Sequence, residues 1–302
     1  MAQKPMTLSN LRKMFPDDDA CLEHMIRVRY GDRHTCAKCG KDARYYRVRN
    51  RRSYECEHCG NQVYPTAGTP FEKTRTPLVD WFHVMFMFST SRNGVAAKEI
   101  QRALGVTYKT AWRMGHQIRD FMAYLDGDAP LGGPGGGPVE IDKAFIGGKD
   151  KTGEDDKAVV LGMKERGGEV ITRVVKSRRS FDVIPHVAAH VRPGSRVYTD
   201  EAHAWNELRW SGDYTHRAVV HSRKEWVRGD VSVNALEGYW ANVKRMIKGT
   251  HIWVSKRHLQ KYLCEAEYRH NLRNVPYAMF ELLISAFPAG AEAASASPQE
   301  GN

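Results

Sequence analysis

A run of short apolar segments decides the fold, and it begins with VEIDKAFIG at residues 139–147. The run continues with AVVLGMKE (158–165), EVITRVVK (169–176) and SRVYTD (195–200). These segments are rich in Val and Ile and are bounded by glycine or charged turns, which is typical of β-strands. Between the third and fourth, FDVIPHVAAHV (181–191) has helical spacing. Three strands, a helix, another strand and then further helices predict an α/β domain with a mixed sheet and flanking helices.

The ends of this domain are marked by changes in composition. LGGPGGGP at residues 131–138 cannot support regular structure, so it predicts a Gly/Pro linker over 127–138 and a domain boundary. At the other end, AGAEAASASPQEGN consists of small and polar residues and predicts a disordered tail over 288–302. We therefore expect the α/β domain to occupy residues 139–287.

Residues 76–126 have helical periodicity, with breaks at Asn93-Gly94 and at Gly105. The second break is followed by Thr107, a candidate N-cap for the next helix. This is helix-turn-helix patterning, which in DNA-binding proteins places the second helix in the major groove. An ordinary helical hairpin fits the same spacing and is the alternative. If the segment binds DNA, the contacting residues are expected to be Tyr108, Lys109 and Arg113.

Four of the six cysteines form two close pairs, in CAKCG and CEHCG, with sixteen residues between the pairs. The four are Cys36, Cys39, Cys56 and Cys59. Four thiolates satisfy tetrahedral Zn²⁺, and the glycine after each pair lets the backbone turn around the metal. The spacing predicts a zinc ribbon over residues 31–66, preceded by a helical lead-in over 1–30. Two disulfides are the alternative, but nothing indicates the oxidising compartment that they would need.

Two basic stretches are candidate DNA contacts. The hairpin YYRVRNRRSYEC mixes arginines with tyrosines, which suits phosphate contacts and base stacking. Residues 242–261 contain no acid and would follow a DNA backbone. A solvated surface is the alternative in both places. The candidate contacts are Arg47, Arg49, Arg51 and Arg52 in the hairpin and Arg245, Lys248, Lys256 and Arg257 in the second stretch.

Composition restricts the class of partner. Lys and Arg number 46 against 35 Asp and Glu, giving a net charge of +11 and a pI near 9.4. This balance favours a polyanion such as nucleic acid. No apolar run approaches the roughly 20 residues that span a bilayer. The N-terminal segment also lacks the apolar core and cleavage site of a signal peptide, so we expect a cytoplasmic, reducing location.

Three carboxylates have positions that suit a metal site. Asp142 closes the apolar segment VEID, Asp200 ends SRVYTD, and Glu237 lies in a helical segment with Lys244 on the same face. Such a trio can hold two Mg²⁺ ions, while the lysine contacts a DNA phosphate near the scissile bond. Other acids compete for these roles: Glu140, Asp156, Glu201, Asp213 and Asp230.

Several motifs in order give the chain a family resemblance. They are TAGTPFEKTRTPLVDWF after the cysteines, LGVTYKTAWRM, VEIDKAFIGGK, VYTDEAHAW, and the long motif that runs from VNALEGYW to EAEYRHN. Together with the zinc ribbon, this order resembles the zinc-ribbon insertion-sequence transposases whose catalytic part is an ISXO2-like DDE domain. The resemblance covers most of the chain.

The resemblance implies a ribonuclease-H-like fold in which Asp142 and Asp200 are the first two catalytic acids and Mg²⁺ or Mn²⁺ is the cofactor. The third position is either Asn234 or Glu237, and Glu237 is preferred because a carboxylate binds Mg²⁺ better than an amide does. Lys244 matches a lysine of the family. After the first aspartate the chain has Lys143 and Ala144, where relatives often carry an acidic residue and a threonine.

The resulting hypothesis is a DNA transposase associated with a prokaryotic nucleoid. It would bind the terminal inverted repeats of its element as a homo-oligomer, hydrolyse a phosphodiester to free a 3′-hydroxyl, and use that hydroxyl to attack target DNA. The rival hypotheses are a zinc-dependent DNA-binding regulator, a nuclease that cuts without joining, and an inactive domesticated copy. Metal-dependent cleavage and joining distinguish the transposase from all three.

Overall fold

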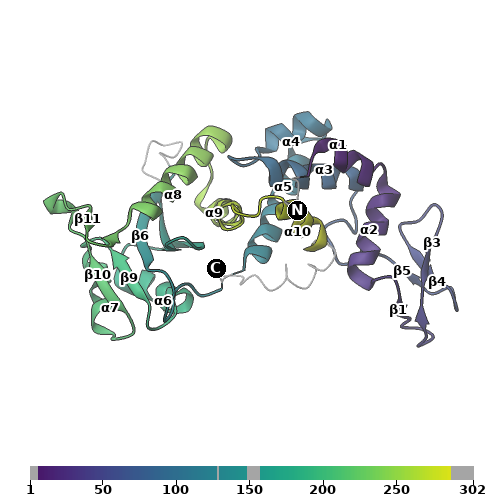
Figure 1. Ribbon diagram of the computed structural model, residues 1–302. Helices are drawn as coiled ribbons and strands as arrows, with labels where there is room; N and C mark the ends of the chain where they lie inside the picture. Colours follow the sequence, from purple (N-terminus) through teal and green to yellow (C-terminus); the bar gives the residue numbers. More distant parts are fainter. Residues whose placement is uncertain (1–5, 128, 148–156, 287–302) are drawn as a thin grey trace. The chain divides into compact units, whose positions relative to one another are not determined.

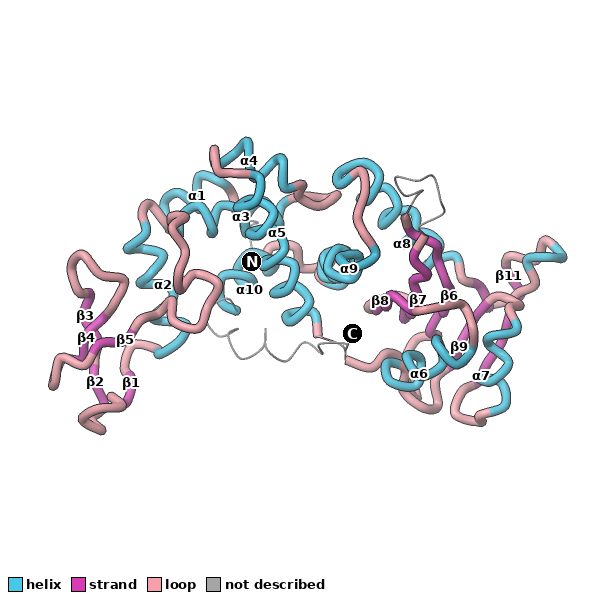
Figure 2. Tube along the Cα trace, turned by 180° about the vertical axis from the view of Figure 1, so that it is seen from behind, coloured by secondary structure: helices cyan, strands magenta, loops and turns pink. Residues whose placement is uncertain are grey.

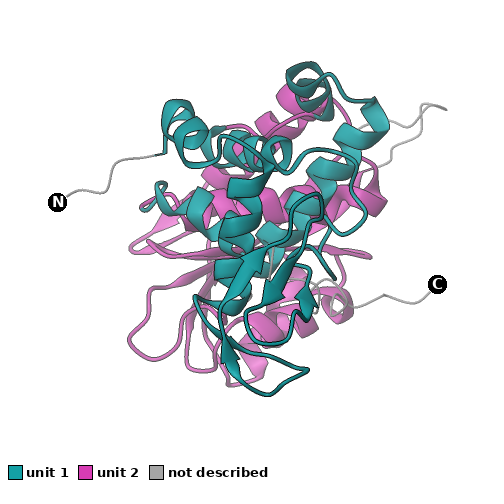
Figure 3. Cartoon of the chain, turned by 90° about the vertical axis from the view of Figure 1, so that its right-hand side faces the viewer, with its two compact units in different colours: residues 1–91, 97–125, 275–302 teal, residues 92–96, 126–274 magenta. Residues whose placement is uncertain are grey.

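The structure is a computed structural model that describes residues 6–127, 129–147 and 157–286. The chain forms two compact units, which Figure 3 shows in different colours. Unit 1 consists of residues 1–91, 97–125 and 275–302, and unit 2 of residues 92–96 and 126–274. The tail expected over 288–302 lies outside the described residues.

Unit 1 begins with two short helices, α1 (Leu8–Met14) and α2 (Asp18–Tyr30), separated around Pro16. Each helix has a side-chain N-cap, because Thr7 Oγ1 accepts from Asn10 N at 3.2 Å and Asp17 Oδ1 accepts from Ala20 N at 2.9 Å. The ribbon that follows has five short strands. They are β1 (His34–Thr35), β2 (Asp42–Ala43), β3 (Tyr45–Arg47), β4 (Tyr54–Cys56) and β5 (Gln62–Val63).

The core of unit 1 is an aromatic cluster around α3 (Leu78–Thr90). Phe82 of α3 packs against Phe15, with ring centroids 4.7 Å apart. Phe280 of the last helix, α10 (Ala278–Ala286), contacts the rings of both Phe15 and Phe86. The α/β domain expected over 139–287 therefore ends earlier, because the apolar face of α10 has its aromatic partners in unit 1.

Two further helices of unit 1 occupy the segment with helix-turn-helix patterning. They are α4 (Ala97–Leu104) and α5 (Tyr108–Asp126). Gly105 makes the turn between them with φ of 67°, a backbone conformation that favours glycine. Thr110 N donates to Thr107 Oγ1 at 3.2 Å, so the predicted N-cap is confirmed. Two helices joined by a tight turn are present, with Tyr108, Lys109 and Arg113 exposed on the second helix.

Unit 2 is built on a five-stranded mixed sheet in the order β10-β9-β6-β7-β8. The central strand β6 pairs antiparallel with β7 and parallel with β9; β7 pairs antiparallel with β8, and β9 pairs parallel with β10. The five strands are β6 (Val139–Ile146), β7 (Ala158–Glu165), β8 (Val170–Val175), β9 (Arg196–Thr199) and β10 (Thr215–Ala218).

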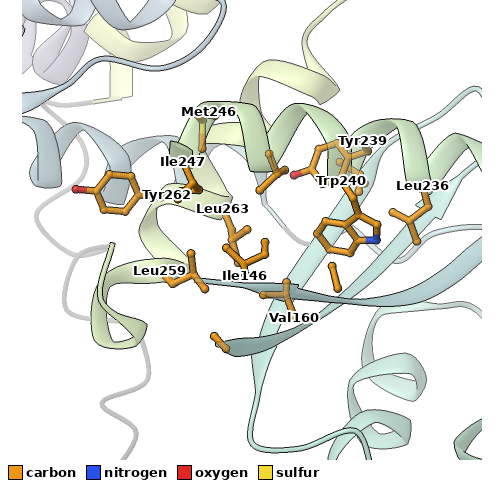
Figure 4. Packing of buried hydrophobic residues seen from close by; sticks show 14 residues of the cluster. Ile146, Val160, Leu236, Tyr239, Trp240, Met246, Ile247, Leu259, Tyr262 and Leu263 are labelled. Carbon is orange, nitrogen blue, oxygen red and sulfur yellow. The ribbon is translucent and has the colours of Figure 1, made fainter. Parts of the chain in front are cut away.

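Helices cover both faces of this sheet (Figures 1 and 2). On one face, α8 (Asn234–Arg245) and α9 (Lys256–Asn271) enclose the apolar cluster shown in Figure 4, which includes Ile146 and Val160. On the other face, α6 (Ser180–His190) and α7 (Asn206–Trp210) pack against Ile141 and its neighbours. Residues 142, 144 and 146 alternate with 141, so Asp142 belongs to the face that α8 covers.

Four predicted strands and the predicted helix between them are confirmed. One detail was wrong: Asp142 does not close its strand, because β6 continues for four residues to Ile146. The fifth strand, β10, has the polar sequence THRA and lies at the edge of the sheet, so it lacks the apolar pattern on which the prediction rested. A small hairpin of β11 (Val227–Arg228) and β12 (Val231–Ser232) was also not predicted.

The Gly/Pro segment is irregular, but it is packed into unit 2 and does not serve as a spacer. Leu131 is buried and exchanges backbone hydrogen bonds with His190 and Arg192. Gly132 N and Gly137 N both donate to the carboxylate of Glu165, at 3.1 and 2.8 Å. The polar backbone groups of the segment therefore have partners on the sheet and on α6, and the units divide before it, at residues 125 and 126.

Candidate metal and nucleic-acid sites

The four predicted cysteines converge at one point of the ribbon. Their Sγ atoms all lie within 4.8 Å of one another, with Cys36 and Cys59 3.6 Å apart and Cys39 and Cys56 4.0 Å apart. Four sulfurs about 2.3 Å from a tetrahedral Zn²⁺ would be about 3.8 Å from each other. The donor set therefore fits zinc and rules out the alternative of two disulfides, whose sulfurs would be about 2.05 Å apart.

Each cysteine pair sits on a turn that ends in glycine. Gly40 N donates to Cys36 O at 2.8 Å and Gly60 N donates to Cys56 O at 3.0 Å. These glycines have φ of 68° and 66°, where any other L-residue would be strained. The expectation that they let the backbone fold around the metal is consistent with this geometry.

The basic hairpin of the ribbon divides into two groups of arginines. Arg47 bonds Asp19 at 2.7 Å and Arg52 bonds Asp18 at 3.0 Å, so both fasten the ribbon to α2. Arg49 and Arg51 are exposed. A structural role thus accounts for two of the four predicted DNA contacts, and only the exposed pair presents its charge to solvent.

Asp142 lies on β6, on the face of the sheet that α8 covers, and its carboxylate accepts a hydrogen bond from that helix. Trp240 Nε1, on α8, donates to Asp142 Oδ2 at 3.2 Å. Burial raises the pKa of Asp142 to about 6, and the charges of Asp200 and Glu237 add to the rise. The three predicted acids therefore share one electrostatic environment.

Asp200 directly follows the last residue of β9. Its Oδ1 atom accepts from Trp205 Nε1 at 2.5 Å and from Ala202 N at 3.1 Å. The same indole ring lies against Lys143, whose Nζ is 4.0 Å from the ring centroid. Burial lowers the pKa of Lys143, while the charges of Asp200 and Asp142 oppose this effect. The lysine after the first aspartate thus places a cation within the electrostatic range of both carboxylates.

Glu237 is exposed in the first turns of α8, three residues after Asn234, which is also exposed. The helix is fixed to the sheet at its start by Glu140 of β6. Glu140 is fully buried; its Oε2 accepts from Leu236 N at 3.0 Å and its Oε1 accepts from Arg166 Nη2 at 2.8 Å. Glu140 therefore sets where α8 begins relative to Asp142.

Within the described ranges, the four cysteines are the group of metal-binding side chains whose ligand atoms all approach within 4.8 Å. Asp142, Asp200 and Glu237 do not converge to that degree. The structure brings the trio into one region without forming a closed ligand cage.

The competing acids have other partners. Glu201 accepts from the backbone N–H groups of His221 and Ser222, at 2.8 and 2.9 Å, and these bonds lower its pKa to about 2. Asp230 accepts from the hydroxyl of Tyr198. Asp213 is exposed on the loop before β10, and Asp156 lies outside the described residues.

A cleft of about 720 Å³ opens beside Asp200. Its lining includes Trp205, His216 and three arginines, Arg209, Arg217 and Arg228. The sequence does not mark these arginines, since they come from three different elements, α7, β10 and β11, and form no basic run.

Two family models match the chain. A transposase zinc-ribbon domain matches residues 16–62, and an ISXO2-like transposase domain matches residues 134–271. Together the two matches cover more than half of the 302 residues. The chain belongs to the zinc-ribbon transposases with an ISXO2-like domain.

Two relatives agree with this assignment. The chain is 27% identical, over 87% of its own length and 94% of the relative's, to an "uncharacterized protein in transposable element ISH50" of Halobacterium salinarum. It is 29% identical to an "uncharacterized transposase-like protein" of Haemophilus influenzae over 34% of its own length and 81% of the relative's. In the described part of the chain no helix is long and apolar enough to cross a membrane.

The sequence alone did not identify the residues that orient the predicted acids. Trp205 and Trp240 donate to the two aspartates, and Glu140 anchors α8, although Glu140 had been counted among competing catalytic acids. The signal for the tryptophans was present in VYTDEAHAW and LEGYW, because each indole lies within five residues of a predicted acid. The role of Glu140 required the fold, since its partner Leu236 is 96 residues away.

Gly162 offers a test of how tightly α8 is seated. A methyl group at this position of β7 would lie 2.9 Å from Trp240 Cη2, closer still to Cζ2, and 3.1 Å from Leu236 Cδ1. We expect Gly162→Ala to lower the free energy of unfolding by about 1–3 kcal/mol, because it overpacks the contact. It should also reduce DNA cleavage, since Trp240 must move away from Asp142.

The matched control for Gly162→Ala is Gly238→Ala on α8, where an added methyl group meets nothing within 4 Å. This variant should be as stable as the wild type or about 1 kcal/mol more stable, because alanine favours helix. Thermal unfolding and a cleavage assay of both variants provide the measurement. Equal behaviour of the two would show that the seating of Trp240 is not tight.

Asp142 gives the stability of the Mg²⁺-free protein a defined pH dependence. Its pKa in the fold, about 6, exceeds the ordinary 3.8, so the folded state retains a proton that the unfolded chain loses. Stability should fall as pH rises from about 4 to 6, by on the order of 2–3 kcal/mol. Asp142→Asn should remove this loss of stability. The variant should therefore unfold at a higher temperature than the wild type at pH 7.5, whereas the two should unfold at similar temperatures at pH 4. A wild type and variant that track each other across this range would contradict the prediction.

Proposed function

We propose that this protein is the DNA transposase of an insertion sequence, with a DDE-type site formed by Asp142, Asp200 and Glu237. The observation that carries the proposal is the shared environment of the three acids, in which Asp200 and Glu237 add to the effect of burial in raising the pKa of the half-buried Asp142. The five-stranded order, with an antiparallel trio of strands extended by two parallel ones, supports a ribonuclease-H-like fold.

The donor set fits a hard divalent cation. Asp142, Asp200 and Glu237 offer oxygen ligands, which Mg²⁺ and Mn²⁺ prefer, and cations would offset both the burial and the carboxylate repulsion that raise the pKa of Asp142. Bound there, the metal would supply an activated water or 3′-hydroxyl nucleophile and neutralise charge on the leaving oxygen. Asn234 is the alternative third position. It is exposed at the first residue of α8 but carries no charge to affect Asp142.

The protein's own side chains orient this chemistry. Trp240 and Trp205 each donate to one oxygen, on Asp142 and on Asp200 respectively, and so orient the two carboxylates for binding a cation. Lys244 is exposed on α8, two helical turns after Glu237, where it would contact a DNA phosphate next to the scissile bond.

DNA would be bound by several surfaces that the structure leaves exposed. We assign Arg49 and Arg51 of the ribbon to phosphate contacts. A helix-turn-helix role for α4 and α5 is supported by the exposure of Tyr108, Lys109 and Arg113 at the start of the second helix. Transposition joins two ends of one element, so we further propose a homo-oligomer on the DNA, acting at the prokaryotic nucleoid.

The test is an assay of the purified, zinc-loaded protein with labelled DNA that carries the inverted repeats flanking its gene. Reactions with Mg²⁺, with Mn²⁺ and without either metal are scored for nicks and for joined products. Metal-dependent nicking followed by joining is expected. Binding without cleavage would identify a DNA-binding regulator or an inactive copy, and cleavage without joining would identify a nuclease.

A further inference from the structure

The helix that carries Glu237 does not end in a regular cap. After Arg245 it continues as a π-helix, Met246–His251, and the chain then leaves through Ile252 with φ of 66° and ψ of −54°. Trp253 N donates to His251 O at 2.7 Å, so Ile252 is the central residue of a γ-turn. A β-branched residue at positive φ is strained, and such strain persists only where the surroundings impose it.

The surroundings fix the chain on both sides of this turn. Met246 and Ile247 are buried in the core cluster shown in Figure 4. The ring of His251 packs edge-on against Tyr262, with centroids 4.7 Å apart, and Val254 packs against the same cluster. The backbone is therefore held before and after Ile252 and Trp253.

The two residues between these anchors point into solvent. Ile252 is 76% exposed and Trp253 is 53% exposed, and both are large and apolar. Folding thus gains little from their burial, although it imposes strain at Ile252. Strain of this kind clusters at functional sites, and so do π-helical turns.

The charges around the turn indicate what the pair contacts. Lys244, Arg245 and Lys248 precede it, and Arg257 follows it; all four are exposed. None of the first three forms an ion pair in the part of the chain that the structure describes, so their charges remain available for phosphates. An apolar side chain amid unpaired cations is the arrangement by which proteins insert between DNA bases while holding the backbone.

We propose that Ile252 and Trp253 form a wedge that enters the transposon end and opens one base step, with Trp253 stacked on the exposed base. This proposal rests on the proposed function. Ile252 lies 15 residues after Glu237, which corresponds to at most about 22 Å at the α-helical rise, because the chain leaves α-helical geometry after Arg245. DNA that follows the row of Lys244 and Lys248 would therefore be opened at up to about six to seven base pairs from the scissile phosphate, at about 3.4 Å per pair.

The experiment places 2-aminopurine at successive positions of the terminal repeat and measures its fluorescence with the full-length, zinc-loaded protein, Mg²⁺ being omitted. The wild type should raise the fluorescence several-fold at one or two positions up to about six to seven base pairs from the cleaved bond. Trp253→Ala should abolish the rise. Trp210→Ala is the matched control, because Trp210 is 75% exposed on α7 of the same unit.

A mismatch at the opened step gives a second readout that a structural role would not change. Because the mismatch removes part of the unstacking cost, the wild type should bind mismatched DNA about tenfold tighter than paired DNA, whereas Trp253→Ala should bind both equally. Ile252→Gly should unfold at a higher temperature than the wild type, since glycine accepts the positive φ, and yet open the step less.

The outcomes separate this proposal from the proposed function. Wild type that binds and cleaves the ends with no fluorescence change at any position overturns the wedge alone. The same follows if Trp253→Ala opens the step as the wild type does. Wild type that neither binds nor cleaves the terminal DNA overturns both.

Discussion

Asp142→Asn and Asp200→Asn should each reduce DNA cleavage and strand transfer by about a thousandfold or more, because each change would remove one charged ligand from the proposed metal site. Asparagine retains an oxygen that can accept from Trp240 or Trp205, so the local packing should be preserved. Binding of the terminal repeats should be unchanged. The measurements are the rates of nicking and joining and the affinity for DNA in a gel-shift assay.

The matched control for these variants is Asp213→Asn, which removes a carboxylate from an exposed loop of the same unit. It should cleave and join at the wild-type rate. Glu237→Gln and Asn234→Ala, compared under the same conditions, decide the third position: only the first should act like the aspartate variants. Full strand transfer by both Asp142→Asn and Asp200→Asn would rule out the assigned site.

Removal of zinc should unfold the ribbon. The buried centre of the ribbon consists of Cys36, Ala43 and Cys56, with Cys39, Tyr45 and Cys59 packed around them, so it has almost no apolar core apart from the ligands. Binding of a structural Zn²⁺ supplies on the order of 10 kcal/mol of folding free energy in such modules. Cys39→Ser should therefore bind less zinc and expose residues 31–66 to rapid proteolysis.

The control for the zinc prediction is Cys264→Ser, a change of the same type at a cysteine of α9 outside the ribbon. It should retain a full equivalent of zinc and resist proteolysis as the wild type does. Zinc content by atomic absorption and limited proteolysis are the two measurements. A Cys39→Ser protein whose ribbon still resists proteolysis would show that zinc binding does not stabilise the folded ribbon.

The parts of the protein that the sequence predicted are those with a local signal. The cysteine spacing specifies the geometry of the ribbon, and strands β6 to β9 are short Val- and Ile-rich segments, as expected for strands covered on both faces. The edge strand β10 has no apolar pattern, so only its pairing with β9 identifies it as a strand. Asp142 appeared to close a strand because a charged residue is unusual in the middle of a buried one, and that departure from the pattern is itself the mark of the site.

The supports of the site could not be predicted because they act across the fold. Glu140 bonds the backbone of Leu236, and Trp240 bonds Asp142 from a helix 98 residues further along the chain. The Gly/Pro segment appeared to be a spacer because its composition is that of one, whereas its backbone groups bond Glu165 and His190. Likewise, the sequence favours DNA contacts at Arg47 and Arg52, because only the fold brings their acidic partners on α2 next to them.

The return of α10 to the aromatic cluster of unit 1 affects how the protein is made. Phe280 reaches Phe15 and Phe86 only after all of unit 2 has been synthesised, since residues 126–274 precede the last of the three segments of unit 1. Protein segments fold as they emerge from the ribosome, so the core formed by the first ninety or so residues is completed only after the last helix has been synthesised. A product truncated before residue 275 would contain every proposed catalytic residue but would lack Phe280. Its aromatic cluster would be incomplete at Phe15 and Phe86, and proteases should therefore degrade it more readily than the full chain.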